Sequence, residues 1–146
     1  MSKTVVMTLR LPKDVARDVE RLAVRSGHKA AQLGARLLEE GLRRRDYPQI
    51  DLRQTAGGRV AYLAGTRFAV YWVVQAIRGG VSAAQFAKEY DLPVERVRTA
   101  LVYAQNFPDE IEADIEHAEA NRKWIESQED SYRDLPASHK GKRRAA

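Results

Sequence analysis

The strongest constraint on the fold lies at the start of the chain, where residues 4–12 alternate in side-chain type and end at a proline. Alternation over eight residues predicts a β-strand, because successive side chains of a strand point to opposite faces. The apolar face carries Met7, Leu9 and Leu11. The opposite face carries Val6, Thr8 and Arg10.

Two helices are predicted directly after this strand. The first has apolar residues at helical spacing: Val15, Val19, Leu22 and Ala23. The second repeats the pattern: Ala30, Leu33, Leu37, Leu38 and Leu42. Gly27 separates the two stripes and is a typical helix stop. A strand and two helices within 48 residues cannot bury a core alone, so we expect pairing with a second copy. The paired strands would form a two-stranded ribbon that fits the major groove of DNA.

This order of elements, with the run Thr8–Pro12, resembles the ribbon-helix-helix family. The resemblance implies a DNA-binding homodimer in which Val6, Thr8 and Arg10 point at base edges. The family usually has Ser or Thr at the start of the second helix, where a phosphate binds. Lys29 stands there instead and can contact a phosphate itself. The alternative is a strand and two helices that serve only to dimerise.

The composition narrows the class of protein. The 146-residue chain has no cysteine and no long apolar run, and it does not begin with a secretion leader. We therefore expect a cytoplasmic protein without disulfides or a membrane span. The three histidines are scattered, and no motif for a nucleophile, metal or cofactor is present, so we expect no enzyme activity and no cofactor. Residues 1–48 carry 11 basic and 6 acidic side chains, which suits a polyanion.

A second domain is predicted over residues 49–107, after a helix-breaking proline at 48. Residues 59–63 and 67–70 are interpreted as two strands joined by a turn at 64–66. A helix over 71–78 follows, and then a helix capped by Ser82 and Gln85 and a third helix after Pro93. This is a helix-turn-helix outline. The outward residues of the third helix are expected to be a solvated face rather than a DNA reader: Arg96, Arg98 and Thr99.

Residues 62–70, 79–82 and 100–104 resemble a small homeodomain-like family of unknown function that occurs in VapB-like bacterial antitoxins. The hallmark is a hairpin with an Ala-Gly-Thr-Arg turn, matched by residues 64–67. The resemblance implies an antitoxin whose partner is a PIN-like ribonuclease toxin.

The third segment, residues 108–146, holds 10 acidic and 3 basic residues up to position 136 and then four basic ones. Pro108 and the acids after it predict a helix start. Apolar residues here are candidates for toxin binding: Ile111, Ile115, Trp124, Ile125, Tyr132 and Leu135. We expect residues after Ser127 to be disordered without a partner. The alternative is a helix that packs back on the second domain. The basic end can either reach toward a nuclease site or add nonspecific affinity for nucleic acid.

The sequence thus predicts a mainly α protein with a ribbon-helix-helix domain (1–48), a homeodomain-like domain with a β-hairpin (49–107), and a partner-binding helix with a flexible tail (108–146). The predicted function is a type II antitoxin that neutralises its toxin and binds operator DNA to repress its own operon. It would act as a homodimer or as a higher oligomer with toxin. The alternatives are a stand-alone dimeric repressor and a protein-interaction adaptor.

Overall fold

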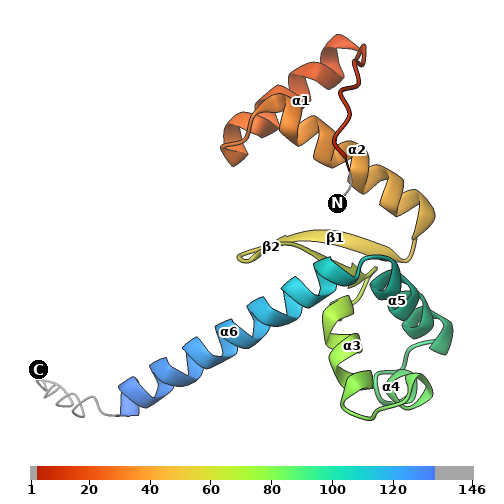
Figure 1. Ribbon diagram of the computed structural model, residues 1–146, viewed down its shortest axis with the longest axis vertical. Helices are drawn as coiled ribbons and strands as arrows, with labels where there is room; N and C mark the ends of the chain where they lie inside the picture. The colour runs from red at the N-terminus through yellow and green to blue at the C-terminus, as the bar shows by residue number, and fades with distance from the viewer. Residues whose placement is uncertain (1–2, 134–146) are drawn as a thin grey trace, which may run out of the picture. The chain divides into compact units, whose positions relative to one another are not determined.

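The computed structural model describes residues 3–133, and the chain divides into two compact units, residues 1–48 and 49–146 (Figure 1). We call these the N-terminal unit and the second unit. Within residues 3–133 the chain is mainly helical, with six helices and one two-stranded antiparallel sheet. None of these helices is long and apolar enough to cross a membrane.

The N-terminal unit consists of an unpaired segment followed by a helix pair. Residues 3–12 form no strand in the single chain, so the predicted β-strand is absent there. A strand needs a hydrogen-bonded neighbour, and the described part of this chain offers none to the segment. The two helices match the prediction: α1 covers Lys13–Ser26 and α2 covers Ala30–Asp46. Gly27 closes α1 in the left-handed region, at φ 68°, where a side chain would be strained.

The second unit begins with a β-hairpin whose position differs from the prediction. Strand β1 (Ile50–Thr55) pairs with β2 (Gly58–Leu63), so the hairpin turn lies at residues 56–57. The Thr55 hydroxyl donates to the Gly58 carbonyl at 2.8 Å and accepts from the Gly57 N–H at 3.2 Å. The predicted strand at 59–63 is confirmed, but the predicted strand at 67–70 is wrong, because only an isolated bridge joins Ala69 to Tyr62.

The Ala-Gly-Thr-Arg turn at 64–67 therefore links β2 to a helix rather than to a second strand. The Thr66 hydroxyl donates to the Leu63 carbonyl at 2.8 Å and accepts from the Phe68 N–H at 3.1 Å. Two arginines donate hydrogen bonds to backbone carbonyls of the turn. Arg53 donates to the Thr66 carbonyl at 2.6 Å, and Arg96 donates to the Ala64 carbonyl. These bonds occupy backbone groups that would otherwise continue a strand.

Three helices follow, and they match the sequence prediction closely. They are α3 (Val70–Arg78), α4 (Ala83–Glu89) and α5 (Val94–Asn106). The predicted capping box forms, with the Gln85 N–H 3.1 Å from the Ser82 hydroxyl and the Ser82 N–H 2.9 Å from the Gln85 side-chain oxygen. The largest fully buried side chains define the core of this unit: Tyr103, Phe86, Leu63, Ile111, Val70, Val73 and Val97.

The last helix, α6, covers Pro108–Arg133. Its first part packs on α3 and α5, while Figure 1 shows its later turns extending beyond those helices. The expectation of disorder after Ser127 is wrong for the next six residues, which continue the helix to Arg133. The rest of the predicted flexible tail, including the basic cluster after position 139, lies outside the described residues.

Candidate functional site

An apolar groove runs through the N-terminal unit. It has a volume of about 640 Å³ and lies between the segment before α1 and the two helices. Its apolar lining includes Val5, Met7, Leu9, Leu11, Leu38 and Leu42. All six are more than one-third exposed, and Met7 remains 73% exposed. Among residues 3–48, only Ala23 and Leu33 are buried. Two helices with so small a core leave a face that is open to a partner.

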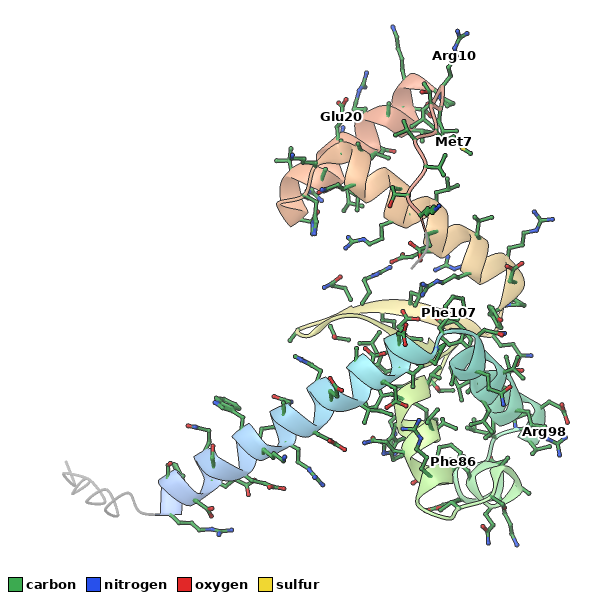
Figure 2. The ribbon with its side chains drawn as sticks, viewed as in Figure 1. Met7, Arg10, Glu20, Phe86, Arg98 and Phe107 are labelled. Carbon is green, nitrogen blue, oxygen red and sulfur yellow. The ribbon has the colours of Figure 1, made fainter. Side chains whose placement is uncertain are left out.

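The three residues predicted to read DNA lie on the other side of the same segment. Val6, Thr8 and Arg10 are exposed, and none of them lines the groove. Figure 2 shows the Arg10 side chain extending away from both helices. Lys29 is exposed at the N-cap of α2 and forms no side-chain cap.

Three polar residues on the third helix of the helix-turn-helix outline make hydrogen bonds or ion pairs within the second unit. Arg96 was predicted to point outward, but it is half-buried and donates to the Ala64 carbonyl. Arg98 pairs with Glu95 at 2.5 Å, and the Thr99 hydroxyl donates to the Glu95 carbonyl at 2.9 Å. The arginine and threonine side chains of α5 are thus engaged within the unit, which favours a structural role over base recognition.

The residues predicted to bind a toxin fall into two groups along α6. Ile111 and Ile115 are 2% and 7% exposed, so they belong to the core and are not available to a partner. Their helical spacing is equally compatible with core packing and with partner binding, so the sequence alone could not show that these two residues are buried. Two polar contacts anchor the same turns: the Tyr103 hydroxyl donates to Glu110 at 2.9 Å, and Arg78 pairs with Glu112.

The later turns of α6 form the second group. Every residue from 119 to 133 is exposed. Trp124, Ile125 and Tyr132 are 61%, 43% and 76% exposed and line a shallow groove of about 470 Å³. We call these three residues the distal stripe. Leu135, the last predicted contact, lies outside the described residues.

Sequence reasoning missed a polar recess between the hairpin turn and α6. It has a volume of about 420 Å³, and its lining includes Tyr62, Tyr71, Asp114, His117 and Asn121. Asp114, His117 and Asn121 share one face of α6, but Tyr62 and Tyr71 come from β2 and α3, so no sequence spacing joins the whole set. Gly57 was the one visible signal, since a glycine in a turn permits close approach of another group. Among the described residues no group of three or more His, Cys, Asp or Glu side chains could hold a metal ion.

Residues 53–104 match a family model described as Protein of unknown function (DUF433). The match begins within β1 and ends within α5, so it contains the turn at 64–67 and the helices α3 and α4. The N-terminal unit and α6 lie outside it. No curated protein and no solved structure matches the chain.

Proposed function

We propose that this protein is a type II antitoxin, in which a dimeric N-terminal unit binds operator DNA and the distal stripe binds a PIN-like ribonuclease toxin. The observation that carries the proposal is the open apolar groove of the N-terminal unit. The same segment that lines this groove carries the exposed residues Val6, Thr8 and Arg10 outside it.

A second copy is the partner that suits the groove best. The segment before α1 supplies alternate apolar residues to the groove, and its backbone has no strand neighbour among residues 3–133. Two such segments, placed antiparallel, would satisfy each other's N–H and C=O groups and cover both grooves. A symmetric dimer is also the commonest solution for a self-complementary surface.

DNA is the favoured ligand of the opposite face. In the paired ribbon, Thr8 and Arg10 would share one surface from both copies. An arginine donates a forked pair to the O6 and N7 atoms of guanine, and a threonine hydroxyl bonds to either kind of base. The excess of basic residues in the first 48 positions supports the same partner through phosphate attraction.

The distal stripe supports toxin binding. An exposed helix with one aromatic and aliphatic stripe is the form in which helices enter a hydrophobic groove of another protein. Trp and Tyr are also the residues that most often dominate such interfaces. The anchored turns with Ile111 and Ile115 would present this stripe from a folded base.

The DNA arm is tested with the full chain and a duplex from upstream of its own reading frame. Arg10→Ala should weaken binding by about 1–3 kcal/mol and relax the preference for guanine at the contacted position. Arg21→Ala is the control, because Arg21 is an exposed arginine on α1, outside the segment that carries Arg10, and it pairs with Asp18 at 4.0 Å. Equal affinities for both variants, or binding insensitive to salt, would contradict DNA recognition by this face.

The toxin arm is tested with the product of the adjacent reading frame and a ribonuclease assay. A chain that ends at residue 118 keeps both buried isoleucines but lacks the stripe. It should leave the nuclease active, whereas the full chain silences it. Inhibition by both would move the toxin-binding surface elsewhere. Absence of any complex with the full chain would favour the stand-alone repressor.

A further inference from the structure

The recess between the hairpin turn and α6 contains an acid without a hydrogen-bond donor. Oδ2 of Asp114 is buried and has no hydrogen-bond partner among the described residues. Burial raises the pKa of Asp114 to about 6, with a further rise from Glu110 and an opposing effect of His117. A buried carboxyl oxygen without a donor is costly, so the site is stabilised by any donor that enters it.

The wall of the recess is formed by a close approach of two elements. A Cβ atom at Gly57 would lie 2.3 Å from Nε2 of His117, so the hairpin turn rests against that imidazole. A side chain at position 57 would require either the turn or the His117 imidazole to move. Asp114 and His117 lie three residues apart on α6 and therefore share one face of the helix.

Two phenol rings complete the lining. The guanidinium carbon of Arg53 lies 4.6 Å from the centre of the Tyr62 ring, so one face of that ring already holds a cation. The pKa of Tyr71 is raised by burial and by the nearby Tyr62 and Asp114, which keeps its phenol neutral. Neutral aromatic rings beside a carboxylate form the environment that attracts organic cations.

We propose that this recess binds an organic cation, with an ammonium or guanidinium group donating to Asp114 and lying beside the Tyr71 ring. A metal ion fits less well, since Asp114 is the only carboxylate in the lining and the metal would need more oxygen ligands. A volume of about 420 Å³ admits a small diamine or one basic side chain with its neighbours. The inference does not depend on the proposed function.

The test uses the full chain and two probes, agmatine and the peptide acetyl-Gly-Arg-Gly-amide. Backbone NMR signals of residues 55–57 and 114–121 are followed during titration. We expect saturable shifts for at least one probe, and the tighter probe tells whether a free amine or a protein side chain is the natural source. No saturable shift with either probe up to about 50 mM, a limit that detects even weak millimolar binding, would overturn the proposal.

Matched variants locate the site. Asp114→Asn removes the carboxylate at nearly constant size and should weaken binding about tenfold or more, because a charge-assisted hydrogen bond is lost. Glu116→Gln makes the same change at an exposed position of the same helix and should alter affinity less than about twofold. Equal affinities for the two variants would overturn the assignment.

A second readout does not depend on a variant. Binding of a cation must lower the pKa of Asp114, since it favours the ionised carboxyl. Titration of the carboxyl carbon of Asp114 with and without saturating agmatine measures this shift. An unchanged pKa at saturation would contradict direct contact.

Discussion

Residues 1–48 leave most of their large apolar side chains exposed, whereas residues 49–118 bury most of theirs in a core. In the described part of the N-terminal unit, only Ala23 and Leu33 are buried, and a groove is lined by exposed leucines, valine and methionine. The second unit buries Tyr103 and Phe86 together with aliphatic residues of the hairpin and its helices, and the rings of Trp72 and Tyr90 pack against Phe86. Both regions contain amphipathic helices. They differ in burial because two helices pack together in the first region, whereas a hairpin and four helices pack around one core in the second.

This difference bears on what stabilises each unit. A core that closes within one chain gives a free energy of unfolding that does not depend on protein concentration. An apolar groove that needs a second copy makes stability rise with concentration, because association removes the folded monomer from the equilibrium. The same contrast recurs within α6, where Ile111 is buried and Trp124 is 61% exposed.

The largest expected effect comes from opening the core of the second unit. Phe86 is 1% exposed, and its ring centre lies 4.7 Å from that of Tyr90 and 5.7 Å from that of Trp72 (Figure 2). Phe86→Ala should lower the free energy of unfolding by about 3–5 kcal/mol, because a cavity replaces a packed ring. Urea unfolding followed by tryptophan fluorescence measures it at two protein concentrations.

Val102→Ala is the matched control for the core. Val102 is 48% exposed on α5, so its truncation should change stability by less than about 1 kcal/mol. A loss that depends on protein concentration in Phe86→Ala would mean that the second unit also relies on a partner, and the contrast between the units would fail.

The second-largest expected effect is a weakening of dimerisation by a charge in the groove of the N-terminal unit. Leu38→Asp places a charge on the groove lining, and burial of that charge in a dimer should cost about 3 kcal/mol, or roughly a hundredfold in the dimer dissociation constant. Sedimentation equilibrium measures this constant. Val24→Asp is the control, since Val24 is 83% exposed and lies outside the groove. Equal dissociation constants for the two variants would rule out the groove as the interface.

The helices were predictable from sequence because their signals are local. Apolar spacing and Gly27 located α1 and α2, and the Ser82–Gln85 pair located α4. The hairpin was misplaced for a physical reason. Strand β1 alternates with polar residues such as Asp51 and Arg53 and lacks a long apolar signal, whereas residues 67–70 look strand-like but follow a turn closed by Thr66. Tertiary bonds from Arg53 and Arg96 to that turn decide the outcome.

The candidate surfaces were predictable only in part. The alternating side-chain pattern predicted that Val6, Thr8 and Arg10 lie on one face. In the structure all three are exposed and none lines the groove. Periodicity could not separate the buried Ile115 from the exposed Ile125, since both lie on one helix and only the packing of α3 and α5 distinguishes them. The recess around Asp114 needs contacts between elements that no sequence pattern encodes.

The smallest effect concerns Asp114, whose buried Oδ2 atom has no hydrogen-bond partner among the described residues. The pKa of Asp114 lies near 6 in the folded chain, above its ordinary value of 3.8. The folded state therefore holds a proton that the unfolded state has lost, so stability is highest below pH 4 for this group and falls as pH rises through 6. Asp114→Asn should remove that fall and, after allowance for solvent screening, stabilise the unit by about 1 kcal/mol at pH 7. Urea unfolding from pH 4 to 8 measures it, with Glu116→Gln as the control. A parallel pH dependence in both variants would show that the recess is open enough to solvate the charge of Asp114.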